Sequence, residues 1–142
     1  MSETPQEEAD IVYRICPWVT NEELNPLFVV SWPDHQWRDF GPVLSRSLTY
    51  ICAFYKGRLI GFVNLAWDGG LHAFLLDPTV HPDWRHRGIG RSLVQRSVIV
   101  AQAHGVEWVH VDFDVALRDF YQRCGFGPTE AGLIHLESTS RA

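Results

Sequence analysis

The sequence predicts a mixed α/β (α+β) fold in which a central sheet carries helices on both faces. Apolar runs of strand length follow one another between residues 49 and 80, separated by glycine-containing turns, which is typical of hairpins. The segment that begins at Ile89 repeats its apolar residues at helical spacing. Strand-like and helix-like segments then alternate up to residue 136, giving the element order β-α-α-β-β-β-α-β-α-β-β.

The N-terminal third is expected to contain a flexible tail, one strand and two helices. Thr20 can cap a helix, and Glu22 and Glu23 would lie in its first turn, where the helix dipole favours carboxylates. The segment around Pro33 ends this helix. The expected elements are a tail over residues 1–10, a strand over 11–16 and helices over 20–30 and 39–47, within a single domain over 11–142.

The remaining elements are delimited by turn and stop signals. Glycines follow Lys56 and Asp68, and His104-Gly105 is typical of a helix C-terminus. Pro78 cannot donate to a strand ladder, so it marks either a bulge in its strand or the strand's early end. The expected elements are strands over 49–55, 58–67, 71–80 and 108–113, helices over 89–103 and 115–124, and two short closing strands within 126–136.

Composition narrows the function classes. The 142 residues carry a net charge of −5, which argues against a general nucleic-acid binder and favours a cationic partner. No segment approaches transmembrane length and the first ten residues are acidic, so we expect no membrane association and no signal peptide. The scattered Cys16, Cys52 and Cys124 predict buried free thiols in a reducing cytoplasm, with no disulfide and no metal site.

A basic loop, Arg85–Gly90, lies between the strand that ends at Val80 and the following helix. Its glycines let backbone N–H groups approach a ligand, and the helix dipole and the arginines add positive charge. The loop therefore predicts a pyrophosphate site, with a tight turn that binds nothing as the alternative. Leu93 replaces the third glycine of the dinucleotide fingerprint, and the lysine of a P-loop is absent, so neither of those ligand classes is expected.

Three segments together resemble the GCN5-related N-acetyltransferase (GNAT) superfamily. Residues 80–90, VHPDWRHRGIG, are similar to the acetyl-CoA pyrophosphate loop of that family, R/Q-x-x-G-x-G/A. Residues 108–113, WVHVDF, lie where the fifth strand of the family is found, and residues 120–126, FYQRCGF, are similar to its Y-x-x-x-G-F segment. The resemblance implies a mostly antiparallel sheet with one parallel strand pair that splays apart and binds acetyl-CoA in the gap.

The resemblance also implies where acetyl-CoA, the co-substrate, would be held. Its pantetheine arm would bond to the backbone at Thr79 and Val80 like an added strand, and its pyrophosphate would lie on the loop. Asp114 departs from the asparagine of many relatives, and an ionised aspartate accepts but does not donate hydrogen bonds. The residues expected to bind acetyl-CoA are Thr79, Val80, Arg85, His86, Arg87, Gly88, Ile89, Gly90 and Asp114.

Three side chains are candidates for proton transfer. Tyr121 occupies the family position of the residue that protonates the departing thiolate, and the two pKa values, about 10 and about 8.5, permit this transfer. The alternative for Tyr121 is a buried aromatic that packs on the sheet. The acceptor amine must also lose a proton, for which Asp77 and His72 are candidates, Asp77 also as an anchor for the amine. A turn-capping Asp77 and a structurally satisfied His72 are the alternatives.

In the family fold the acceptor pocket is built from the first helices and the loop between them. Here that region is rich in aromatic, carboxylate and imidazole groups, which can bind an amine by apolar contact, cation–π attraction and hydrogen bonds. The expected acceptor-binding residues are Trp32, Asp34, His35, Trp67 and Asp68. The same composition also suits a dimer interface, so a homodimer is an alternative use of this surface.

Together these inferences predict an acetyl-CoA-dependent N-acetyltransferase. It would move the acetyl group to a primary amine, on a small molecule or a peptide, by direct transfer within a ternary complex. The alternative is a non-catalytic acyl-CoA-binding sensor or interaction module on the same fold.

Overall fold

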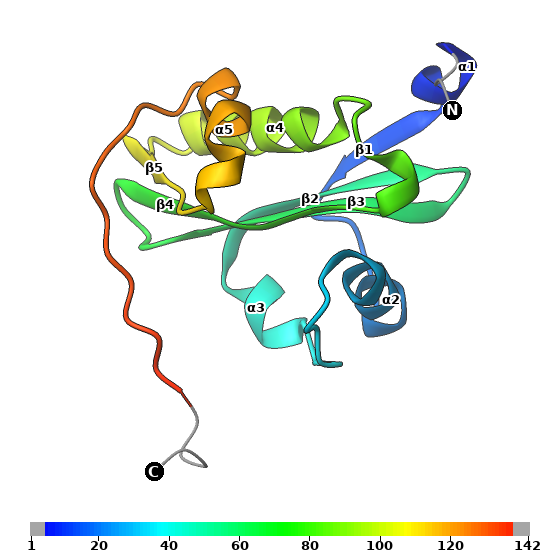
Figure 1. Ribbon diagram of the computed structural model, residues 1–142, viewed down its shortest axis with the longest axis horizontal. Helices are drawn as coiled ribbons and strands as arrows, with labels where there is room; N and C mark the ends of the chain where they lie inside the picture. The colour runs from blue at the N-terminus through cyan, green and yellow to red at the C-terminus, as the bar shows by residue number, and fades with distance from the viewer. Residues whose placement is uncertain (1–4, 138–142) are drawn as a thin grey trace. The chain divides into compact units, whose positions relative to one another are not determined.

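A computed structural model describes residues 5–137, which form two compact units, one up to Val111 and one from Asp112. The first unit contains a five-stranded sheet in the order β1-β2-β3-β4-β5 (Figure 1). Neighbouring strands are antiparallel except β4 and β5, which are parallel, so the predicted mixed, mostly antiparallel sheet is confirmed. The strands are β1 (Ile11–Ile15), β2 (Ser47–Tyr55), β3 (Arg58–Trp67), β4 (His72–Val80) and β5 (Trp108–His110).

Helices cover both faces of this sheet, as predicted. α2 (Asn21–Ser31) and α3 (Gly41–Ser45) lie on one face, and α4 (Ile89–Ala103) lies on the other (Figure 1). α2 begins with a reciprocal cap, because the Glu23 amide donates to Thr20 Oγ1 at 3.2 Å and the Thr20 amide donates to the Glu23 carboxylate at 3.1 Å. The other helical segments are α1 (Pro5–Ala9), η1 (Pro82–Trp84), η2 (Val115–Leu117) and α5 (Arg118–Arg123).

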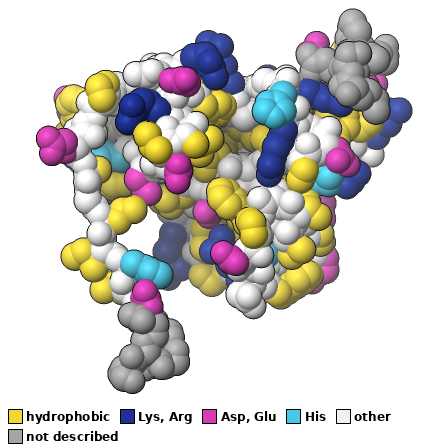
Figure 2. Space-filling view, in the orientation of Figure 1, with side chains coloured by type: hydrophobic (Ala, Val, Ile, Leu, Met, Phe, Trp, Pro, Cys, Tyr) yellow, Lys and Arg dark blue, Asp and Glu magenta, His cyan; other side chains and the backbone are white. Residues whose placement is uncertain are grey.

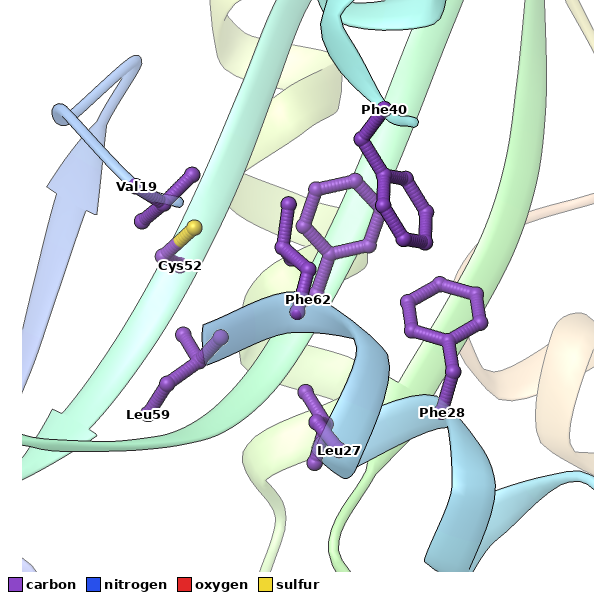
Figure 3. Packing of buried hydrophobic residues seen from close by; sticks show 8 residues of the cluster. Val19, Leu27, Phe28, Phe40, Cys52, Leu59 and Phe62 are labelled. Carbon is purple, nitrogen blue, oxygen red and sulfur yellow. The ribbon is translucent and has the colours of Figure 1, made fainter. Parts of the chain in front are cut away.

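An aromatic cluster joins α2 and the loop before α3 to the sheet (Figure 3). The ring centroid of Phe28 lies 4.9 Å from that of Phe40 and 5.7 Å from that of Phe62, in tilted and edge-on geometries that aromatic pairs prefer. All three side chains are buried. This packing fixes the loop between α2 and α3 against β3, and that loop carries several of the predicted acceptor-binding residues.

Gly61 in β3 lets α4 approach the opposite face closely. A Cβ at this position would lie 3.1 Å from Leu93 Cδ1 and 3.3 Å from both Ala53 Cβ and Ile89 Cγ2. We expect Gly61→Val to lower the free energy of unfolding by about 2 kcal/mol, because a packed helix–sheet contact must shift to admit the side chain. Urea denaturation measures this, with Gly127→Val as the control, since a Cβ at Gly127 meets nothing within 4 Å. Equal midpoints for the two variants would contradict the close packing at Gly61.

The C-terminal segment differs most from the prediction. The two short strands expected within 126–136 are absent, because residues 126–137 contain no strand. Gly127, Pro128 and Gly132 interrupt this segment, and Leu133 and Leu136 are 78% and 86% exposed. A strand needs a neighbouring strand that bonds its backbone N–H and C=O groups. The apolar side chains of this segment do not by themselves provide such a neighbour.

Several other helices and strands have bounds that differ from the predicted ones. The strand expected over 108–113 is the three-residue β5, because its pairing with β4 stops at His110. The helix expected over 39–47 is the shorter α3, since β2 already begins at Ser47, and the helix expected over 115–124 is divided into η2 and α5. Cys52 is buried as predicted. Cys16 is exposed, so the expectation that it is buried is wrong.

Part of the expected N-terminal tail is helical. Residues 5–9 form α1, and residues 1–4 lie outside the described residues. The flexible tail over 1–10 and the single domain over 11–142 therefore stay predictions. Within residues 5–137, no helix is both long enough and apolar enough to cross a membrane.

Candidate active site

β4 carries the bulge that Pro78 suggested. Its register with β3 shifts between Phe62 and Asn64, so that Asp77 and Pro78 together oppose one residue of β3. Asp77 has a φ of 52°, a conformation that L residues rarely adopt. The strand nevertheless continues to Val80, so Pro78 marks a bulge and not the end of the strand.

From Leu75 onward, the edge of β4 that faces β5 is open. β4 and β5 pair over three residues, and the last pair is Phe74 with His110. Among the described residues, no strand pairs with the β5 side of β4 from Leu75 to Val80. An extended ligand with amide groups could form hydrogen bonds to this backbone as an added strand would. This agrees with the expected pair of parallel strands that splay apart.

Arg85 closes the end of this open edge. The His81 amide donates to the Ile60 carbonyl at 2.8 Å, and the trans peptide bond therefore turns the Val80 carbonyl away from β3. That carbonyl accepts a hydrogen bond from Arg85 Nε at 3.1 Å. Arg85 thus links the basic loop to the strand end while the rest of its exposed guanidinium stays available for an anion.

The loop before α4 has the backbone geometry of an anion site. His86 and Gly88 have φ values of 64° and 82°, and Gly88 is the N-cap of α4 without any side-chain cap. The first amide N–H groups of α4, from Ile89 onward, therefore lack a capping side chain, and the helix dipole adds partial positive charge there. Successive backbone N–H groups arranged in this way can hold the oxygens of a phosphate group.

The Arg87 side chain is held on other partners. Its guanidinium forms a 3.1 Å ion pair with Glu7 of α1 and lies 4.7 Å from the ring centroid of Trp84. The Arg87 side chain is therefore engaged by α1 and Trp84 in this arrangement. The sequence motif could not indicate this, because Glu7 is remote in the chain.

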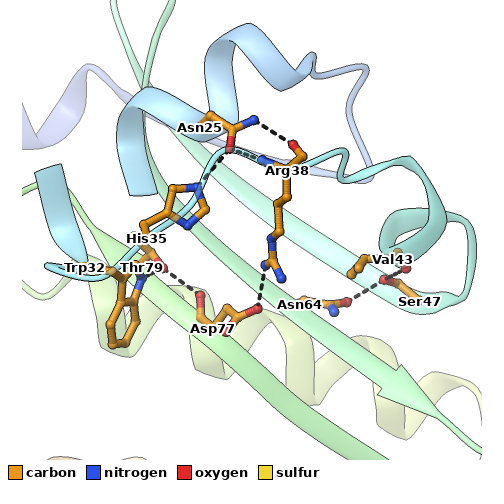
Figure 4. Close-up of polar contacts among 9 residues, drawn as sticks. All are labelled: Asn25, Trp32, His35, Arg38, Val43, Ser47, Asn64, Asp77 and Thr79. Atoms are coloured by element: carbon orange, nitrogen blue, oxygen red, sulfur yellow. Dashed lines mark hydrogen bonds and ion pairs between the residues drawn. The ribbon is translucent and has the colours of Figure 1, made fainter. Parts of the chain in front are cut away.

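The loop between α2 and α3 is fixed by one buried amide, Asn25 (Figure 4). Asn25 Nδ2 donates to the carbonyls of Asn21 and Arg38, and Asn25 Oδ1 accepts from the Arg38 amide at 3.0 Å. His35 Nε2 lies 2.8 Å from the same Oδ1. Burial, followed by the nearby Arg38 charge, lowers the pKa of His35, so its neutral form is favoured. His35 therefore helps to hold the loop in place through its contact with Asn25.

Two other loop residues reach β4 directly. Trp32 Nε1 donates to Thr79 Oγ1 at 3.0 Å, and Thr79 Oγ1 in turn donates to the Asp77 carbonyl at 2.8 Å (Figure 4). Arg38 forms a 3.3 Å ion pair with the Asp77 carboxylate, and its guanidinium also lies 4.5 Å from the ring centroid of Phe40. The structure thus brings the predicted Trp32, Asp77 and Thr79 together at the bulge.

The remaining predicted acceptor residues lie elsewhere. Asp68 caps the turn between β3 and β4, and hydrogen bonds from the Gly70 and His72 amides lower the pKa of its carboxyl. Trp67 contacts the ring of His104, which follows α4, and so lies on the face opposite α2. Asp34 is exposed. Composition alone could not assign these residues to a face of the sheet.

His72 has a partner that sequence reasoning missed. Its Nδ1 lies 2.8 Å from Nε2 of His110, because β4 and β5 pair in a register that places both rings on one face. In the predicted strand, the side chains of Val109 and His110 point to opposite faces. The neighbouring residues in the sequence do not indicate which residue of β4 would lie beside His110.

In the second unit, Tyr121 lies in an aromatic cluster. Its ring stacks on Phe113 at 4.6 Å and meets Phe120 and Phe126 edge-on at 4.9 and 5.8 Å. Burial, with smaller contributions from Cys124 and Asp112, raises the pKa of Tyr121 to about 12. The hydroxyl therefore stays protonated at neutral pH, as a proton donor must.

Asp114, the departure from the family asparagine, is the N-cap of η2. Its carboxylate accepts a hydrogen bond from the Ala116 amide at 2.9 Å. This contact gives Asp114 a local structural role, and its contact with pantetheine stays a prediction.

Comparison with known proteins places this arrangement in a family. The sequence model of the Acetyltransferase (GNAT) family matches residues 18–126. The chain belongs to the GNAT acetyltransferase family. The matched region includes the bulged β4, the Arg85–Gly90 loop and the segment around Tyr121.

Two curated acetyltransferases match over part of their length. Mycothiol acetyltransferase of Mycolicibacterium vanbaalenii is 32% identical over 83 residues, which are 58% of this chain and 27% of that protein. An uncharacterized N-acetyltransferase of Gracilaria tenuistipitata var. liui is 24% identical over 101 residues, which are 68% of this chain and 56% of that protein. The chain therefore spans only about a quarter and about half of these two relatives.

Solved structures confirm the GNAT fold. A candidate acetyltransferase from Deinococcus radiodurans R1 superposes with a TM-score of 0.78 at 27% identity, covering 95% of this chain and 93% of that one. A GNAT family protein from Streptococcus pneumoniae TIGR4 has a TM-score of 0.75 at 22% identity, with 89% and 98% covered. An aminoglycoside N-acetyltransferase determined with CoA has a TM-score of 0.69 at 19% identity, with 89% and 94% covered.

Proposed function

We propose that this protein transfers the acetyl group of acetyl-CoA to a primary amine by direct transfer in a ternary complex. The observation that carries the proposal is the end of β4, where an unpaired strand edge leads into a loop and an uncapped helix N-terminus. Membership of the GNAT family supports the reaction, and the CoA bound to one structural relative supports the donor.

In this proposal the donor is held by backbone and by one arginine. The amides at the start of α4 and the guanidinium of Arg85 bind the pyrophosphate, and the open edge at Thr79 and Val80 binds the pantetheine arm. Acetyl-CoA supplies an activated thioester. A backbone N–H near Val80 polarises its carbonyl group, and Tyr121 protonates the sulfur that leaves.

Asp77 suits an anchor for the acceptor. One oxygen of its carboxylate accepts a hydrogen bond from Arg38, which leaves the second oxygen for the ammonium group of an amine. The Trp32 ring, fixed on Thr79, adds an aromatic surface beside it. This arrangement favours a cationic acceptor, on a small molecule or a peptide.

Calorimetric titration with acetyl-CoA tests the donor site. We expect Arg85→Ala to weaken binding at least about 10-fold, because it removes a charge-assisted contact to phosphate and frees the loop from Val80. Arg14→Ala is the control, since it removes one exposed arginine from β1 at the far edge of the sheet. Equal affinities for the two variants would place the pyrophosphate elsewhere.

The same preparation distinguishes an enzyme from an acyl-CoA sensor. An acetyltransferase releases CoA thiol when amines are added with acetyl-CoA, which a thiol reagent detects by absorbance. Binding of acetyl-CoA without thiol release across a panel of small amines and peptide N-termini would favour the sensor.

A further inference from the structure

The imidazole pair formed by His72 and His110 borders the open edge of β4. His110 is the last residue of β5 that pairs with β4, and its partner in the register is Phe74. The ring of His110 stacks on that of Phe74, with centroids 4.8 Å apart. His110 therefore lies at the point where the two strands separate, and His72 lies two residues before Phe74 on the same face.

This face is the one that α2 and α3 cover in part. Phe74 and Leu76 pair with Ala66 and Asn64 of β3, and residues opposite one another in an antiparallel pair share a face. Asn64 Oδ1 accepts a hydrogen bond from the hydroxyl of Ser47, which begins β2 two residues after the end of α3 (Figure 4). Phe74 and Leu76 are each 39% exposed, so this face presents accessible apolar side chains beside the imidazole pair.

We propose that His110, positioned by His72, takes the proton from the acceptor ammonium, and that the acceptor carries an apolar body that lies on Phe74 and Leu76. This inference rests on the proposed acetyl transfer and names its proton acceptor and its substrate class. A polyhydroxylated amine would lose its hydration on this surface without hydrogen-bond partners, whereas an apolar amine gains by covering it.

The hydrogen bond between the rings determines which nitrogen acts. When His110 Nε2 carries the hydrogen and donates it to His72 Nδ1, His110 Nδ1 presents a free lone pair. A proton taken up at Nδ1 leaves this hydrogen bond intact, with neutral His72 as its acceptor.

The charged groups near the pair do not block this step. The Asp68 carboxylate accepts the His72 amide at 3.2 Å, and farther along β4 the Asp77 carboxylate is paired with Arg38. Asp68 therefore places a carboxylate beside the backbone of His72.

Two protons leave the acceptor nitrogen during the transfer. An N–H bond of the ammonium breaks and its proton passes to His110 Nδ1 and then to water. The freed nitrogen lone pair forms the bond to the acetyl carbon, the C–S bond breaks, and the sulfur leaves with its electron pair. Tyr121 protonates that sulfur, and the second proton lost by the nitrogen restores Tyr121 through solvent.

A matched pair of probe amines tests the proposal. Phenethylamine is protonated at pH 7 and must lose a proton, whereas O-benzylhydroxylamine has nearly the same shape but is already unprotonated. We expect His110→Gln, which keeps an amide nitrogen at the position of Nε2 but has no base, to slow transfer to phenethylamine about 100-fold. Transfer to O-benzylhydroxylamine should stay within about 3-fold of the unmodified protein, since no base is needed.

Two further variants separate positioning from packing. His72→Asn keeps a polar group near the position of Nδ1 and should retain most of the phenethylamine rate, whereas His72→Leu should lose it and spare O-benzylhydroxylamine. His104→Gln is the control, because His104 bonds the Val100 carbonyl at the end of α4, on the other face, and should leave both rates unchanged.

Each other outcome overturns the inference. Equal losses with both probes would assign His110 a structural role, and no loss with either would remove it from catalysis. Transfer to ethanolamine or glucosamine but to neither aromatic probe would refute the apolar acceptor while leaving the proposed acetyl transfer standing. Absence of thiol release with every amine would refute both.

Discussion

Replacing Tyr121 by phenylalanine is expected to lower the kcat of acetyl transfer by about 100-fold and to leave the Kd of acetyl-CoA nearly unchanged. Phenylalanine keeps the ring that packs on Phe113, Phe120 and Phe126, so the substitution removes only the hydroxyl. Without that hydroxyl the thiolate must leave unprotonated or take its proton from water. Steady-state kinetics with an amine that the unmodified protein accepts, together with calorimetry, measure the two effects.

Tyr13→Phe is the matched control for this experiment. It removes a hydroxyl from β1, at the far edge of the sheet, where the Tyr13 ring lies against Arg96. A loss of kcat in Tyr13→Phe of the same size, or a Tyr121→Phe protein with normal kcat, would leave Tyr121 as a core aromatic without a catalytic role.

The raised pKa of Tyr121 gives this prediction a pH dependence. A folded-state pKa of about 12 lies above the value of about 10 for an unfolded tyrosine, so the folded protein holds this proton more tightly. The resulting contribution to stability is fully present below pH about 10 and is lost as the pH rises toward about 12. The stability of the unmodified protein relative to Tyr121→Phe should therefore fall across this window, which denaturation at several pH values can follow.

Asn25→Leu is expected to produce the largest loss of stability, about 3 kcal/mol. Leucine has a similar volume, so the change leaves the packing in place but removes every hydrogen bond of the buried amide. The amide N–H and carbonyl of Arg38 and the ring of His35 then lose their partner. Urea denaturation measures the loss, and Gln95→Leu, at an exposed position of α4, is the control for placing leucine in a helix.

The same variant should also affect function selectively. The loop that Asn25 holds positions Trp32 and Arg38 on β4, whereas the Arg85–Gly90 loop is built independently of it. We expect a raised KM for the amine and an unchanged Kd for acetyl-CoA at a temperature where the variant is folded. An acetyl-CoA affinity that falls as much as the amine affinity would contradict this division of the site.

Features that depend on neighbours in the chain could be predicted from the sequence. The start of α2 at Thr20, the β2–β3 hairpin around Lys56 and Gly57, and the loop before α4 all matched expectation. Each depends on hydrogen bonds or backbone conformations within about four residues, which the residue types themselves largely determine. The bulge at Pro78 belongs to the same group, since proline lacks the N–H that a regular strand would use.

Features that depend on distant partners were decided only by the tertiary structure. Strand register placed His110 beside His72, and α1 brought Glu7 to Arg87. Trp32 and Trp67, grouped by composition, lie on opposite faces because one reaches Thr79 and the other contacts a residue after α4. The sequence by itself determined the fold class and the backbone turn before α4, where short-range geometry suffices. The surface around the β4 bulge required long-range pairing, because a change of one residue in register reverses the face of every side chain.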